Sequence, residues 1–185
     1  QFKNRILPAI SNIIVTRPLK KNELEEYNFV TMNPILNARK LLFYYRLLPD
    51  SRLLFGARGD LSGSQKSSFK KSKWIEMRFK EIFPKWEKIN IDFRWNGFVA
   101  VTRDFTPSLG KLPDEEVYYS FGYHANGLNT ASWCGKELAN FIGGSNHHEM
   151  RISKIFQGLP KRFPFAFLRL LYLRIAFIYY SFIDK

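Results

Sequence analysis

The chain has 185 residues, of which 45% are hydrophobic and 17% aromatic, and this content excludes a wholly disordered polypeptide. Its formal net charge is +13, from 29 basic against 16 acidic residues, which leaves nucleic acid or anionic lipid to be considered as partners. The single cysteine, Cys134, excludes an intrachain disulfide and a thiolate zinc site, and it fits a reducing compartment. The basic residues are scattered and no recognition motif frames them, so we do not expect nucleic-acid binding.

The first part of the chain favours strands. Residues 6–16 are rich in Ile and Val and predict a buried strand, and residues 19–27 predict a short helical turn. Residues 41–48 and 52–58 are expected to pair as a hairpin, because the Pro-Asp-Ser sequence between them is typical turn chemistry.

Side chains along the first hairpin strand should alternate between two faces. Phe43 and Tyr45 are expected on one face, and Tyr44 and Arg46 on the other.

The middle of the chain predicts a loop, a helix and a long strand. Residues 59–68 are polar and rich in Gly and Ser, and they predict a loop. A helix is expected from about Ser72, because apolar residues then recur at helical spacing until Pro84 interrupts it. Residues 89–102 predict a long strand, in which Gly97 marks a bulge or a close backbone approach.

Residues 109–116 form a link to a second strand, a tight turn and a helix. Residues 117–121 suit a strand, Gly122 breaks it, and the Asn126-Gly127 pair predicts a turn that tolerates positive φ. A helix should follow and end at Gly143-Gly144, with apolar or small residues repeating as Leu128, Ala131, Gly135, Leu138, Ala139 and Ile142.

Such a glycine turn leaves unpaired N–H groups and the positive end of the helix dipole at the helix N-terminus. This end favours an anion or a developing negative charge. A strand, a glycine turn and a helix without any ligand are also common, so the pattern alone does not decide between the two.

Two further stretches hold candidate chemistry. Asn146-His147-His148-Glu149 contains possible metal ligands but lacks helical HExxH spacing, and a solvated loop is expected there. Residues 163–183 are apolar and long enough to cross a bilayer, although Arg169 and Arg174 would each cost about 2.5 to 3.5 kcal/mol at its centre. A helix packed on its own domain is the first interpretation, and attachment to a membrane surface is the second.

The block WNGFxxxTxDxxPxLG at residues 95–110, followed by a strand, Gly-Tyr-His-Ala-Asn-Gly-Leu and a helix of small residues, carries a resemblance. It resembles the C-terminal signature of FAD-dependent amine and amino-acid oxidoreductases, the family of D-amino-acid, glycine, sarcosine and γ-glutamylputrescine oxidases. Further blocks at residues 6–19, 44–58 and 163–184 match in the same order, so the resemblance covers nearly the whole chain.

The resemblance implies a mixed α+β fold. Residues 1–100 would belong to a mainly antiparallel substrate-domain sheet. Residues 101–150 would be the last strand and helix of a Rossmann-like FAD-binding domain, and residues 151–185 a C-terminal helical tail. Because the GxGxxG fingerprint that opens the family's N-terminal half is absent, we expect the chain to be the C-terminal half of a longer cytoplasmic enzyme, with that other half as its partner. The alternative is a small protein with its own fold.

The resemblance also implies a cofactor site. The turn would meet the flavin ring near N1 and the C2 carbonyl, where the helix end stabilises the negative charge of reduced flavin. The flavin-contacting residues carried over by position are Gly122, Tyr123, His124, Ala125, Asn126, Gly127 and Leu128. His124 equally suits a solvent-facing or packing histidine. FAD should be non-covalent, because the cysteine that sarcosine oxidase-like members use near the position of Gly97 is missing.

The implied substrate is a small-molecule amine. Val99 stands where glycine and D-amino-acid oxidases place an arginine for the substrate carboxylate, and the γ-glutamylputrescine oxidase branch also lacks that arginine. A longer amine is therefore expected, oxidised at its C–N bond to an imine by hydride transfer to FAD, with Tyr45, Arg46 and Trp95 as pocket residues. The competing hypothesis is a basic protein that binds membrane surfaces or nucleic acid without a cofactor.

Overall fold

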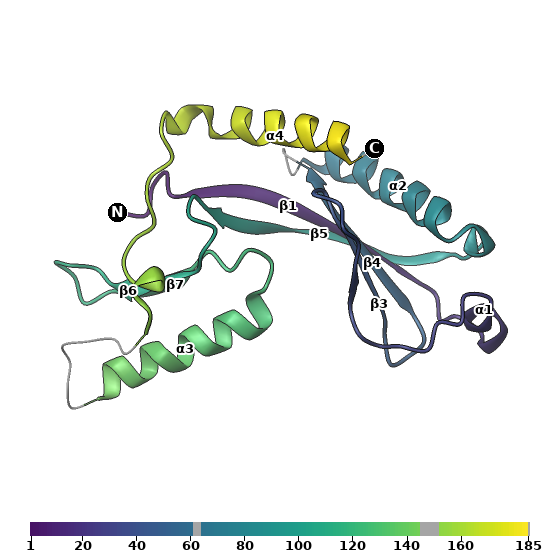
Figure 1. Cartoon of the computed structure of the whole chain (residues 1–185), viewed down its shortest axis with the longest axis horizontal. Coiled ribbons are helices and arrows are strands. Elements are labelled where there is room, and N and C mark those ends of the chain that lie inside the picture. Colours follow the sequence, from purple (N-terminus) through teal and green to yellow (C-terminus); the bar gives the residue numbers. More distant parts are fainter. Residues whose placement is uncertain (61–63, 145–151, 185) are drawn as a thin grey trace. The chain divides into compact units, whose positions relative to one another are not determined.

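The structure is a computed structural model that describes residues 1–60, 64–144 and 152–184 (Figure 1). Its class is mixed α+β, as expected, with a five-stranded sheet in the order β2-β3-β4-β1-β5 and a two-stranded sheet of β6 and β7. The chain divides into two compact units. We call Ala9–Phe98 with Leu173–Lys185 the sheet unit, and Gln1–Pro8 with Val99–Tyr172 the α3 unit. The domain boundaries inferred from the sequence stay predictions.

The strands are β1 (Ile6–Thr16), β2 (Ile35–Leu36), β3 (Phe43–Leu47), β4 (Leu53–Asp60), β5 (Ile91–Thr102), β6 (Ser108–Lys111) and β7 (Tyr118–Phe121). The α-helices are α1 (Lys21–Glu25), α2 (Gln65–Ile82), α3 (Gly127–Gly143) and α4 (Arg169–Ile183). Single 3-10 turns lie at Pro84–Trp86, Lys154–Phe156 and Ala166–Leu168.

The predicted hairpin is confirmed as β3 and β4, which pair antiparallel with Tyr45 opposite Phe55. The Leu48 N–H donates to the Arg52 carbonyl at 2.8 Å, and Ser51 takes up the left-handed φ of 63° that the tight turn needs. Strand β1 then pairs antiparallel with the other side of β4, with Ile14 opposite Phe55. The hairpin therefore lies inside the sheet and not at its edge. Residues that stand opposite each other on β3 and β4 point to the same face of the sheet.

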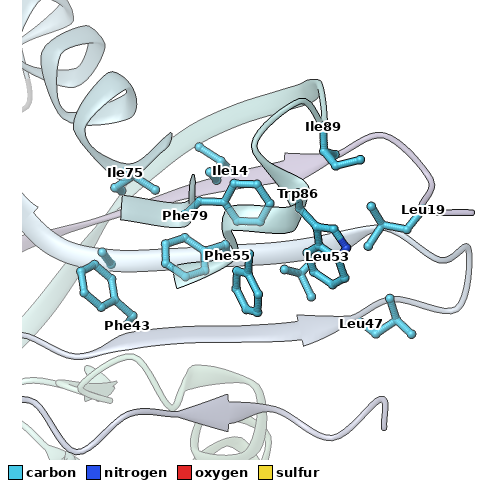
Figure 2. Packing of buried hydrophobic residues seen from close by; sticks show 12 residues of the cluster. Ile14, Leu19, Phe43, Leu47, Leu53, Phe55, Ile75, Phe79, Trp86 and Ile89 are labelled. Carbon is cyan, nitrogen blue, oxygen red and sulfur yellow. The ribbon is translucent and has the colours of Figure 1, made fainter. Parts of the chain in front are cut away.

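An aromatic core covers one face of this sheet, beneath α2 (Figure 2). Phe55 of β4 is fully buried, and its ring centroid lies 5.5 Å from Phe43 and 5.9 Å from Phe79 of α2. Trp86 is also fully buried, and its Nε1 donates to the Glu23 carbonyl at 2.9 Å, which ties α1 to the core. Each such side chain contributes about 1.5–3 kcal/mol by leaving water.

Helix α2 begins seven residues earlier than the sequence predicts. The loop expected at 59–68 is wrong at 59–60, which end β4, and at 65–68, which begin α2, while residues 61–63 lie outside the described residues. The Ser64 side chain accepts from the Ser67 N–H at 3.2 Å and caps a helix that starts at Gln65. The first turns of α2 are rich in Lys and Ser, so they carry too little apolar periodicity to reveal a helix. Strands β2 and β6 were likewise not foreseen, because each is short.

Strand β5 is the last strand of the sheet and is unusually exposed. All seven residues from 92 to 98 are exposed, including Phe93, Trp95 and Phe98. An edge strand presents unpaired N–H and C=O groups that another strand can meet.

Residues Ala166–Ile183 form a helical stretch long and apolar enough to cross a membrane by length and composition alone, with a mean hydropathy of 1.5. Only 6% of the stretch is buried, and Leu173 is the buried residue of α4. After α4, the Asp184 carboxylate accepts hydrogen bonds of 2.7 Å from the N–H groups of Lys40 and Leu41. The expected packing of α4 on its own domain is therefore limited to a narrow strip along one side of the helix.

Candidate functional site

In the α3 unit, a tight turn joins β7 to α3. Gly122, His124 and Ala125 have positive φ of 80°, 51° and 71°, and the Asn126 N–H closes the turn on the Tyr123 carbonyl at 2.8 Å. The expected positive φ at Asn126-Gly127 is wrong, since Asn126 has a φ of −99°. The left-handed backbone falls instead on two residues with side chains, His124 and Ala125, where it costs free energy.

Contacts with Thr102 hold this turn in place. A side chain at Gly122 would bring its Cβ to 2.5 Å from Thr102 Cγ2, so both its φ and the packing demand glycine. The buried Thr102 hydroxyl donates to the Thr106 carbonyl at 2.9 Å and lies 3.0 Å from His124 Nε2. His124 is thereby held at Thr102, half-buried, within the turn.

The N-terminus of α3 is open to solvent. Leu128 in its first turn is 93% exposed, and the Asn126 side chain makes no capping hydrogen bond. Among the described residues, the N–H groups of Gly127, Leu128 and Asn129 have no hydrogen-bond acceptor. Of the seven residues predicted to contact flavin, Ala125, Asn126 and Leu128 are exposed, Tyr123, His124 and Gly127 are half-buried, and Gly122 is buried. They lie together at the positive end of a 17-residue helix, and their contact with flavin stays a prediction.

A hollow of about 470 Å³ lies beside this helix end. Its walls are Pro107, Asn129 and Thr130 together with Trp133 and Phe156, whose rings meet edge to face at 5.4 Å. The lining residues come from three separate stretches of sequence, so no local motif could have revealed them.

In the sheet unit, the face opposite the aromatic core carries polar side chains. Tyr44 lies opposite Gly56, and a side chain at Gly56 would bring its Cβ to 2.2 Å from the Tyr44 ring. The hydroxyls of Tyr44 and Ser11 lie 2.6 Å apart. Burial raises the pKa of Tyr44, while the hydrogen bond with Ser11 and the charge of Arg58 oppose that rise, so its hydroxyl is protonated at neutral pH.

This open sheet face also holds two arginines. Arg58 is in register with Ser11, and Arg46 follows Tyr44 by two residues, so all four share the face. Among the described residues, neither guanidinium has an ion-pair partner. A protonated hydroxyl pair beside two cations is suited to an anion.

The three predicted pocket residues do not share one environment. Tyr45 points into the aromatic core, with its ring 6.0 Å from Phe55 and 5.3 Å from Phe83, so its side chain faces away from Arg46. Arg46 is exposed on the open face. The role of each in substrate binding stays a prediction, whereas Ser11, Tyr44 and Arg58 were not proposed from sequence because only register brings β1 and β4 together.

Trp95 is 46% exposed on β5. Its neighbour Arg94 pairs with Glu76 of α2 at 2.8 Å, and Asn96 donates to Ser68 of α2 at 2.8 Å. Because strand side chains alternate, Trp95 faces away from α2. Its contact with substrate stays a prediction.

Within the ranges that the structure describes, no group of three or more His, Cys, Asp or Glu side chains could hold a metal ion. The Asn-His-His-Glu sequence at 146–149 lies outside those ranges.

The chain also matches a known family. Residues 1–141 match the family DAO, described as FAD dependent oxidoreductase, and the chain belongs to this family.

Two relatives match over the whole length of the chain. The chain is 31% identical over 186 residues to the probable oxidoreductase OrdL of Haemophilus influenzae, covering 100% of the chain and 40% of that protein. It is 26% identical over 191 residues to the gamma-glutamylputrescine oxidoreductase of Escherichia coli, covering 100% of the chain and 42% of that protein. The chain thus spans about two fifths of the length of these relatives.

Solved structures share the fold. Glycine oxidase from Geobacillus kaustophilus has a TM-score of 0.63 at 17% identity, covering 88% of this chain and 41% of that one. Iminodiacetate oxidase from Chelativorans has a TM-score of 0.62 at 18% identity, covering 86% of this chain and 42% of that one.

Proposed function

We propose that the chain supplies the substrate-side sheet and the flavin-facing helix end of an FAD-dependent oxidoreductase that oxidises the C–N bond of an amine. The open N-terminus of α3 carries this proposal, because its uncapped N–H groups and the positive end of its dipole favour the negative charge of a reduced flavin. When bound, FAD supplies the hydride acceptor, and the substrate leaves as an imine that water hydrolyses. FAD would be held without a covalent bond, since Cys134 is buried in α3.

The residues of the α3 unit would act on the cofactor by position and electrostatics. The N–H groups of Gly127, Leu128 and Asn129 would donate toward the electron-rich edge of the ring, and the helix dipole would favour negative charge there. Thr102 and Gly122 would fix the turn that aims these groups. No proton transfer by a side chain is required for this role.

We further propose that the substrate is an amine that also carries a carboxylate, as a γ-glutamylputrescine-like compound does. The open sheet face supports this class, because Arg46 and Arg58 lie beside the Ser11 and Tyr44 hydroxyls and have no ion-pair partner among the side chains that the structure describes. A bidentate guanidinium and a hydroxyl donor are a favourable environment for a carboxylate. The identity to the gamma-glutamylputrescine oxidoreductase, at 26%, agrees with this class.

The first experiment uses the natural gene product that contains this chain, with any coding sequence upstream of Gln1. We expect flavin absorbance to purify with the protein and to be bleached anaerobically by an amine substrate. A colourless protein that does not take up added FAD would reject the proposed function.

The substrate class is tested in the same protein. Arg58→Ala should raise the KM for an amine bearing a carboxylate about tenfold or more, and leave the KM for an amine of equal length without the carboxylate unchanged. Arg78→Ala, which removes a guanidinium from α2 instead, is the matched control. Equal KM changes for both substrates would contradict a carboxylate subsite.

A further inference from the structure

Helix α4 is apolar on its exposed side as well as its buried side. Leu173 is buried, and Ala176 and Phe177 are half-buried. The opposite side is formed by Ile175, Ile178, Tyr179 and Phe182, which are 56% to 66% exposed. Their spacing of i, i+3, i+4 and i+7 makes them one continuous stripe, which we call the outer stripe.

A helix on the surface of a soluble protein normally carries polar residues on its outer side, and a helix that is apolar all round is covered by something. Exposure of four large neighbouring side chains to water is unfavourable, so the outer stripe marks a contact surface.

The charges around the stripe indicate what covers it. Arg169 and Arg174 are the only charged residues between Ala166 and Ile183, and Arg174 is exposed beside the stripe. At the end of α4, Arg39 pairs with the Asp184 carboxylate at 3.9 Å, and the side chain of Asp184 is only 4% exposed. The neighbouring Lys40 is exposed. The apolar stripe is thus bordered by cations at one flank and at its end, with the nearby carboxylate turned inward.

This combination matches an anionic lipid surface, which offers acyl chains to the stripe and phosphate groups to the cations. Tyr179 has an apolar ring and a polar hydroxyl, as favoured at the boundary between headgroups and acyl chains. A span across the bilayer is disfavoured, because two 2.7 Å hydrogen bonds hold Asp184, at the end of α4, against Lys40 and Leu41, which directly precede β3.

We propose that α4 docks the protein on the surface of an anionic bilayer, with the outer stripe in the acyl boundary and Arg174 and Lys40 at the headgroups. This membrane contact does not depend on the proposed flavin chemistry. It assigns the protein a location at a membrane surface.

The test uses the natural gene product that contains this chain and vesicles of phosphatidylcholine with or without phosphatidylglycerol. We expect co-sedimentation with the mixed vesicles at low salt, about tenfold or more weaker binding to pure phosphatidylcholine, and loss of binding as salt rises. Ile178→Glu should abolish binding. Met77→Glu places the same charge at an exposed apolar position of α2 and should leave binding unchanged.

Tyr179→Trp supplies a second readout that does not depend on lost binding, since its fluorescence should shift to shorter wavelength when vesicles are added. Far-UV circular dichroism checks that each variant is folded. Absence of binding to either vesicle would overturn the proposal, as would equal effects of the Ile178→Glu and Met77→Glu variants. A lipid-independent dimer that Ile178→Glu dissociates would also overturn it and assign the stripe to a second copy of the chain.

Discussion

Gly122 combines a left-handed backbone with close packing, and both follow from its place before the α3 turn. Its φ is 80°, and an added Cβ would lie 2.5 Å from Thr102 Cγ2. Gly122→Ala should lower the free energy of unfolding by about 1–3 kcal/mol and lower the fraction of protein that retains flavin. Urea denaturation and the flavin-to-protein absorbance ratio measure the two effects.

Gly135→Ala is the matched control, because an added Cβ in the middle of α3 meets no atom within 4 Å. This variant should be more stable by about 0.5–1 kcal/mol, since alanine suits a helix interior better than glycine. Equal stability of the two variants would contradict the strain at Gly122.

Glu23 provides a pH dependence at the scale of one residue. Hydrogen bonds from Arg17, at 2.8 Å and 2.6 Å, and from the Lys20 N–H, at 2.7 Å, lower the pKa of Glu23 from 4.5 to about 2. A carboxyl whose pKa is depressed in the folded state stabilises the fold above its unfolded pKa. We expect this contribution, about 1–3 kcal/mol, to be complete above pH 4.5 and to be lost as the pH falls toward 2.

Thermal unfolding between pH 6 and pH 2 checks this prediction, because this range runs from above the ordinary pKa of 4.5 down to the lowered pKa of about 2. Glu23→Gln should be less stable at pH 6 and show a flatter acid dependence. Glu25→Gln, whose carboxylate is exposed and 4.0 Å from Lys21, should behave as the unchanged protein. The same acid dependence in Glu23→Gln would show that other groups dominate.

At the scale of elements, the sequence predicts a helix where apolar residues recur at helical spacing and form a face that packs on the core. Helix α3 ends at Gly143 and β1 spans Ile6–Thr16, as the sequence predicts, because glycine and β-branched residues mark those boundaries. The early start of α2 was missed because its capping serine acts through one hydrogen bond and not through periodicity.

The attachment of α4 is an element-scale property that hydrogen exchange can test. Asp184→Asn removes the charge and one of the two acceptor oxygens that bind the Lys40 and Leu41 N–H groups. We expect faster exchange of these two amides and a loss of about 1–2 kcal/mol of stability. Ser181→Ala, which removes a hydroxyl bonded only within α4, should change neither. Unchanged exchange in Asp184→Asn would mean that the helix end is held by other contacts.

At the scale of the whole molecule, the chain covers about two fifths of its relatives and lacks a glycine-rich phosphate-binding fingerprint. The N-terminus of α3 alone supplies a few backbone N–H donors to the flavin ring. The phosphates of FAD would lack the glycine-rich loop that binds them. The isolated 185-residue chain should therefore not bind FAD with micromolar affinity. Quenching of flavin fluorescence measures this, and micromolar binding would contradict it.

The α+β class, the hairpin, the strand–turn–helix unit and the family could all be inferred from the amino-acid sequence, because they depend on local patterns that a few consecutive residues carry. Only the tertiary structure decided which polar residues meet, since the register of β1 on β4 brings Ser11 and Arg58 to Tyr44. The alternation of side chains along a strand predicted that Tyr44 and Tyr45 point to opposite faces of the sheet. It did not predict which of these two faces the hydrophobic core would cover. Burial depends on the elements that pack against a strand, and these come from distant parts of the chain.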